Sequence, residues 1–167
     1  MITSNANTLI KQLRQYKSDL KKKEERIVSE LVEQGTNIAE ANLNRAEYTG
    51  YMDAQITSEA KGKRGSVSLV GYQAGFIEFG TGVYYDRPDE THPLATEYGA
   101  IRGEWGKKRG KTPPWSYPGE PGTSGWSMPK SPGWSQTLGF PANRTMYNTG
   151  KELHQRLNDI VKDIFND

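Results

Sequence analysis

A long helical pattern opens the sequence and limits the folds that the chain can adopt. From residue 5 to residue 34, apolar side chains recur at intervals of mostly three, four or seven residues. These side chains are Leu9, Leu13, Tyr16, Leu20, Ile27, Val28 and Leu31. The other face is charged and includes the run KKKEER at 21–26. The pattern predicts an amphipathic helix over 5–34, kinked at Gly35 and continuing to about residue 46.

The spacing then changes to that of strands, and it returns to that of a helix near the end of the chain. Alternating apolar and polar residues predict strands over about 51–59 and 65–72, joined by a short turn that contains glycine. The segment 75–80 predicts a third short strand. A second apolar stripe predicts a helix over 143–165, with Asn143 as its N-cap. We therefore expect an α+β fold, in which both helices pack on one face of an antiparallel sheet.

A region rich in glycine, proline and tryptophan interrupts these elements at about 83–136. Between Gly99 and Gln136 lie eight of the 18 glycines and six of the nine prolines. All four tryptophans are in this region: Trp105, Trp115, Trp126 and Trp134. We expect a long loop inserted in a single domain that spans 1–167. The conformational entropy lost in ordering so much backbone exceeds the free energy that burial of its own side chains supplies. We therefore expect contacts with neighbouring subunits or proteins to order the loop, with the tryptophans at the interface.

The composition fits a small domain that shares part of its apolar surface with partners. Only 34% of the 167 residues are hydrophobic, and the mean hydropathy is −0.83. The formal net charge of +2 gives no global field that would attract nucleic acid or a membrane. The chain has no cysteine, and its start has no apolar leader segment. These features predict a protein that neither spans a membrane nor follows the general secretory route.

The stretch GFIEFGTG at 75–82 is the most distinctive short motif. A dinucleotide-binding loop would open a helix after its glycines, and no helical pattern follows Gly80, Thr81 and Gly82. Glu78 has no second carboxylate at a spacing suited to acid–base catalysis. The interpretation that remains is structural. Gly80 and Gly82 free the backbone to turn, and we expect Glu78 to accept hydrogen bonds from backbone N–H groups or a neighbouring side chain near 80–82.

The remaining titratable residues suggest neither catalysis nor a cofactor. His92 lies near Asp86, Asp89 and Glu90, and this group could ligate a divalent ion. The glycine placement of a calcium loop is missing, so a solvated loop without metal is the preferred interpretation. His154 falls on the charged face of the second helix. We expect no enzymatic activity, no metal and no cofactor.

Two binding functions stay open as alternatives. Basic runs at 61–64 and 107–111, with aromatic residues between them, could contact nucleic acid, and the tryptophans could stack on sugars. The lysine run at 21–23 is better explained as a solvated helix face followed by compensating glutamates. These alternatives describe a glycan- or nucleic-acid-binding module that uses the tryptophan-rich loop.

Three segments together resemble a known family. They are EYTGYMDAQIT at 47–57 after a long charged helix, AGFIEFGTG at 74–82, and GFPANRTMYNTGKEL at 139–153. In this order they are similar to the tail-component family of long-tailed bacteriophages, the small neck or tail-completion proteins. The resemblance covers about 1–82 and 137–167. Two features depart from it: Ala46-Glu47-Tyr48 replaces a frequent Pro-x-Asp, and the connection at 83–136 is longer than usual.

The resemblance implies a structural role in the virion. Family members are expected to form a closed ring in the neck, between the head-side connector and the tail, and to lack enzymatic activity. The implied partners are further copies of the chain, a head-side connector or adaptor protein, and a tail terminator or tail-tube protein. DNA would pass through the ring without sequence-specific binding. The implied location is the virion, after assembly in the host cytoplasm.

Overall fold

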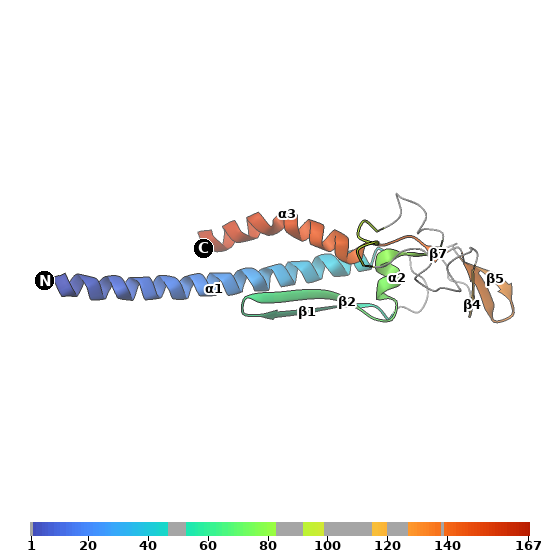
Figure 1. Cartoon of the computed structure of the whole chain (residues 1–167), viewed down its shortest axis with the longest axis horizontal. Helices are drawn as coiled ribbons and strands as arrows, with labels where there is room; N and C mark the ends of the chain where they lie inside the picture. Colours follow the sequence, from blue (N-terminus) through green and yellow to red (C-terminus); the bar gives the residue numbers. More distant parts are fainter. Residues whose placement is uncertain (1, 47–52, 83–91, 99–114, 120–126, 138) are drawn as a thin grey trace.

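The computed structural model describes residues 2–46, 53–82, 92–98, 115–119, 127–137 and 139–167. The described elements are α1 (Ile2–Leu43), β1 (Gln55–Lys61), β2 (Arg64–Val70), α2 (Ala74–Phe79), β3 (Thr81–Gly82), β4 (Trp115–Pro118), β5 (Ser127–Ser131), β6 (Trp134–Thr137), β7 (Gly139–Phe140) and α3 (Thr145–Asn166). The molecule is elongated, with α1 along its long axis (Figure 1). The α+β class predicted from the sequence is confirmed.

Helix α1 is far longer than the elements that pack on it. At 42 residues it extends about 60 Å. Helix α3 runs antiparallel to it and ends beside Lys23, whose Nζ donates to the carbonyl oxygens of Ile164 at 2.9 Å and Phe165 at 3.2 Å. Residues before Lys23 extend beyond α3 (Figure 1). We call residues 5–22 the arm and the remainder of the described molecule the body.

The predicted hairpin is present, and its strands reach closer to the turn than expected. Strands β1 and β2 pair antiparallel from Gln55↔Val70 to Lys61↔Arg64, so the turn consists of Gly62 and Lys63. Gly62 has a φ of 59°, a conformation that favours glycine in tight hairpin turns. The Lys63 side chain forms an ion pair with Glu24 of α1. The turn is therefore fastened to the helix beside it.

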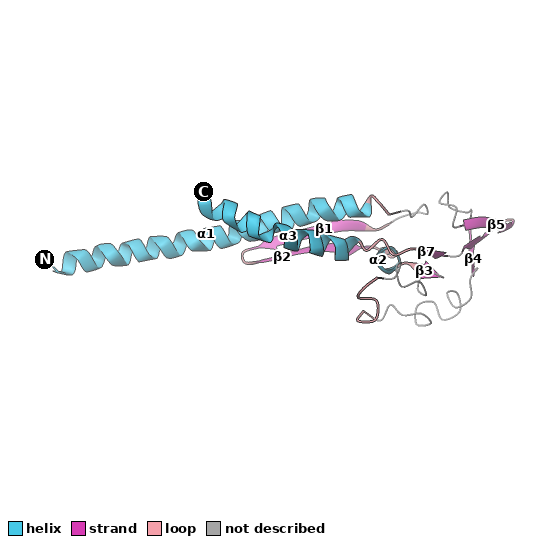
Figure 2. Ribbon diagram, turned by 90° about the horizontal axis from the view of Figure 1, so that it is seen from above, coloured by secondary structure: helices cyan, strands magenta, loops and turns pink. Residues whose placement is uncertain are grey.

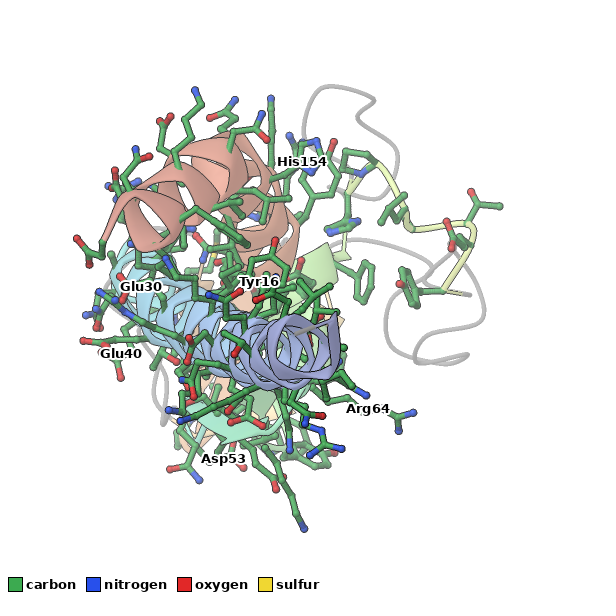
Figure 3. The ribbon with its side chains drawn as sticks, turned by 90° about the vertical axis from the view of Figure 1, so that its left-hand side faces the viewer. Tyr16, Glu30, Glu40, Asp53, Arg64 and His154 are labelled. Atoms are coloured by element: carbon green, nitrogen blue, oxygen red, sulfur yellow. The ribbon has the colours of Figure 1, made fainter. Side chains whose placement is uncertain are left out.

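Helix α1 lies between α3 and the hairpin. Figure 3 looks along α1 from its N-terminal end, with α3 above it and the hairpin below. The predicted continuation of the helix past Gly35 is confirmed, because α1 runs without a break to Leu43. Gly35 permits close packing, because an added Cβ would lie 3.2 Å from Val67 Cγ2 and 3.3 Å from Leu153 Cδ2. The prediction that both helices lie on one face of a sheet needs this refinement: α3 packs chiefly on α1.

The core of the body is small. Among the residues that the structure describes, the buried hydrophobic side chains are Ile38, Ala39, Leu43, Ala54, Ile77, Ile160 and Ile164. Ile77 is fully buried in a cluster with Leu43 and Ala54, where α1, the hairpin and α2 meet. No helix among the described residues is long and apolar enough to cross a membrane.

The third strand predicted at 75–80 is wrong, because Ala74–Phe79 forms the short helix α2. Apolar residues at 76, 77 and 79 satisfy both strand and helix spacing over so few positions. Hydrogen bonds between Asp53 and residues 72–73, which we call the Asp53 clasp, close the base of the hairpin just before this helix begins. The Asp53 carboxylate accepts the N–H groups of Tyr72 at 2.8 Å and Gln73 at 3.3 Å, and the Gln73 side chain accepts the Asp53 N–H at 3.0 Å.

Part of the region predicted as a loop at 83–136 forms strands, and the described segment 92–98 forms turns. Strands β4, β5 and β6 form an antiparallel sheet in the order β4-β6-β5. A loop insertion is thus not confirmed as such. Expectations about residues 83–91, 99–114 and 120–126, including Trp105 and Trp126, lie outside the described residues.

Candidate functional site

The carboxylate of Glu78 lies at the junction of α2 and α3. Glu78 is 8% exposed. Its Oε2 accepts the backbone N–H of Met146 at 2.8 Å, and its Oε1 accepts that of Tyr147 at 3.0 Å. Both donors belong to the first turn of α3, whose N–H groups have no partner within the helix. Glu78 therefore caps α3 from another element and places a carboxylate at the positive end of the helix dipole.

This remote cap compensates for a helix start that has no local one. The N-cap residue of α3 is Arg144, at φ 58° and ψ 36°, and no side chain there caps the helix. The prediction of Asn143 as N-cap is therefore wrong. The side-chain Nδ2 of Asn143 instead donates to Asn42 O at 2.9 Å and to Thr145 Oγ1 at 2.7 Å. Asn143 thus ties the start of α3 to the end of α1.

The two chain segments also bond through their backbones. The N–H of Asn143 donates to Ile77 O at 2.8 Å, and the N–H of Arg144 donates to Glu78 O at 3.2 Å. Three residues after Glu78, β3 begins and pairs antiparallel with β7, with Thr81 opposite Phe140 and Gly82 opposite Gly139. Figure 2 shows α2, β3 and β7 together at this end of α3. The segments 74–82 and 139–147 form one interlocked unit.

The glycine stretch after Glu78 is a helix end followed by a strand. Gly80 has a φ of 75°, which favours glycine, and its N–H donates to Phe76 O at 2.8 Å. Thr81 and Gly82 form β3. The expectation that backbone N–H groups hold Glu78 is confirmed. The expected position of those donors near 80–82 is wrong, because they lie on α3, 68 and 69 residues further along the chain.

His92 completes the surroundings of Glu78. It is 4% exposed, so the solvated loop expected at this residue is wrong. Its Nδ1 accepts the N–H of Leu94 at 3.0 Å. Nε2 therefore carries the proton and donates to Glu78 Oε1 at 2.9 Å. The ring packs beside Phe79, with centroids 4.6 Å apart, and beside Tyr147, with centroids 5.3 Å apart.

An open pocket of about 390 Å³ adjoins this cluster and is lined in part by Glu78, His92, Phe79, Tyr98 and Tyr147. Both ring nitrogens of His92 and both oxygens of Glu78 are already engaged by groups within the chain. These bonds join α2, the start of α3 and the 92–98 segment. Within the described part of the chain, no three His, Cys, Asp or Glu residues are grouped to hold a metal ion. Asp86, Asp89 and Glu90 lie outside that part.

Of the tryptophans proposed for an interface, the two that the structure describes lie on the β4-β6-β5 sheet and not on α2 or α3. Trp134 lies on β6 and is 46% exposed, and the backbone of Trp115 pairs with Thr137 across β4 and β6. No local sequence signal indicates that Glu78 contacts α3 or His92, because these contacts join residues far apart in the chain. The prediction of Asn143 as a local N-cap hid the need of the N–H groups at the start of α3 for an acceptor from another element.

Comparison of the chain with protein-family models, with curated proteins and with solved structures found no match. The resemblance of 1–82 and 137–167 to the phage tail-component family therefore remains a hypothesis that rests on the three sequence segments.

Proposed function

We propose that the chain is a structural protein of a bacteriophage particle, which forms a ring in the neck and joins the head connector to the tail. The observation that carries this proposal is the junction at Glu78. Two of the three segments that resemble the tail-component family, 74–82 and 139–153, bond to each other there through Glu78, backbone groups and the β3–β7 pair. Residues that are far apart in sequence thus serve one architectural purpose.

The nature of that junction supports a structural role over a catalytic one. The carboxylate of Glu78 and the ring of His92 form hydrogen bonds that hold α2, α3 and the 92–98 segment together. The small core and the exposed apolar residues of α1 support burial of further surface by neighbouring molecules. Under this proposal the partners are further copies, a head-side connector or adaptor, and a tail terminator or tail-tube protein.

Disruption of the gene in the genome that encodes the chain tests the proposal. We expect lysates to contain separate filled heads and tails in negative-stain images, and expression of the chain in trans to restore joined particles. Expression of a Glu78→Ala chain should restore fewer. Joined, infectious particles that lack the protein altogether would contradict the proposed function.

A second function, glycan binding, is favoured by the surroundings of Trp134. This half-exposed side chain borders an open pocket of about 290 Å³, which Pro129, Lys130 and Gly133 also line. An aromatic face beside polar groups on a small sheet is suited to stacking against a sugar ring. Titration of tryptophan fluorescence with cell-wall oligosaccharides, for the wild type and Trp134→Ala, tests this alternative. No saturable change in the wild type would exclude it.

A further inference from the structure

The arm carries an apolar stripe that extends past the end of α3. Leu9, Leu13 and Tyr16 are 56%, 58% and 63% exposed. The stripe continues through Leu20 and Ile27, which are half-buried, so it prolongs the face of α1 that packs in the body. In Figure 3, Tyr16 lies on the side of α1 along which α3 runs. A row of large apolar side chains on an otherwise charged helix indicates a surface that another molecule covers.

The body contains an apolar hollow between α1, β2 and α3, with a volume of about 350 Å³. Its walls include Val28, Leu31, Val32, Val67 and Leu153, all of which are half-buried. Gly35, Gly65 and Gly150, one from each element, also line it. At Gly150 an added Cβ would meet no atom within 4 Å. The hollow is thus open apolar space in which large side chains of another molecule fit.

Charge along α1 indicates which molecule fits. The arm carries five basic residues, Lys11, Arg14, Lys17, Lys21 and Lys22, and one acidic residue, Asp19. Residues 24–43 carry five acidic residues, Glu24, Glu25, Glu30, Glu33 and Glu40, and one basic residue, Arg26. Two arms side by side would bring like charges together, whereas an arm beside the body of another copy brings opposite charges together. Glu30 and Glu40 lie on one side of α1 (Figure 3) and are not among the residues that line the hollow, so they steer an arm toward the body from outside the hollow.

We propose that the arm of one copy docks on the body of a second copy, with Leu9, Leu13 and Tyr16 seated at the hollow between α1, β2 and α3. This inference rests on the proposed assembly function and specifies its subunit contact. The arm and the hollow are different surfaces of the same chain. Each copy therefore gives one arm and receives another, and such a head-to-tail contact closes into a ring or continues as a filament.

Two full-length variants test the contact from its two sides. Leu13→Glu places a charge in the stripe, at an exposed position that no fold contact requires. Gly150→Leu places a side chain in the open space of the hollow. The matched control is Ser18→Glu, which adds the same charge to the arm at an exposed position outside the stripe. Circular dichroism checks that each variant is folded, and Leu9→Glu serves as a second arm variant.

Sedimentation velocity then measures the mass of each sample. We expect the wild type and Ser18→Glu to form oligomers, and each of the two interface variants alone to sediment as a monomer of 18.7 kDa. An equal mixture of Leu13→Glu and Gly150→Leu should form dimers, because the intact arm of the second variant meets the intact hollow of the first. A monomeric wild type, oligomers of either interface variant at the wild-type concentration, or a mixture that stays monomeric would overturn the proposal.

The two levels of the proposal fail separately. The mixing experiment uses only the purified chain, so a negative result removes the arm contact and leaves the particle experiment to decide the neck function. Particles that join normally without the protein would remove the neck function, while dimers in the mixture would still establish the arm contact.

Discussion

The carboxylate of Glu78 accepts the backbone N–H of Tyr147 at 3.0 Å, although 69 residues separate the two in the sequence. This contact fastens the start of α3 to α2 and supplies the cap that Arg144 does not. One buried side chain thus joins α2, α3 and the 92–98 segment, and Asn143 links the start of α3 to α1.

Removal of this carboxylate should destabilise the fold. Glu78→Ala leaves the N–H groups of Met146 and Tyr147 and the ring of His92 without their acceptor, so the free energy of unfolding should fall by about 1–3 kcal/mol. Urea denaturation followed by circular dichroism measures the change. Glu40→Ala, at an exposed position of α1, should change stability by less than about 0.5 kcal/mol. Equal stability of the two variants would contradict the capping role.

His92 should be coupled to Glu78 and not merely adjacent to it. His92→Ala removes one donor to the carboxylate and the packing against Phe79, so it should destabilise the protein by about 1–2 kcal/mol. The double variant should lose less stability than the two single variants combined, by about 0.5 kcal/mol or more.

His154→Ala is the matched histidine control, because His154 is exposed on α3 and should tolerate the change. Strict additivity of Glu78→Ala and His92→Ala in urea denaturation would show that the observed 2.9 Å contact carries no energy.

Two glycines of the hollow should respond to alanine in opposite ways. Gly150 lies inside α3 with open space around its Cβ position, so Gly150→Ala should stabilise the chain by roughly 0.5–1 kcal/mol. At Gly65 a Cβ would overlap Val32 Cγ2, so Gly65→Ala should destabilise it by about 1–3 kcal/mol. Thermal and urea unfolding compare the two. A destabilised Gly150→Ala would mean that the hollow is closed in solution.

The periodic elements could be predicted from the sequence because their signals are local. The two apolar stripes located α1 and α3 to within a few residues: α1 runs from Ile2 to Leu43, against a prediction of 5–34 with a continuation to about 46. The hairpin followed from alternation around a glycine turn. Helix α2 did not, because six residues with apolar side chains at 76, 77 and 79 fit both periods, and the Asp53 clasp that orients it is a long-range contact.

The site was predictable only in part for the same reason. An isolated carboxylate in an apolar stretch indicated that Glu78 would accept hydrogen bonds, but its donors are set by the packing of α3 on α1. His92 looked solvated because its neighbours Asp89, Glu90 and Thr91 are polar. His92 is buried because its ring packs against Phe79, which precedes it in the sequence, and Tyr147, which follows it.

The central claim is that copies of the chain form a ring at the head–tail junction, and an image of the particle neck tests it most directly. Purified particles that carry an affinity-tagged chain, imaged by electron cryomicroscopy with averaging of the neck, should show a closed ring of several identical copies between connector and tail. The subunit density should include a rod about 60 Å long for α1, whose end contacts the neighbouring subunit. Absence of the tagged chain from joined particles, or its presence away from the neck as isolated copies, would contradict the claim.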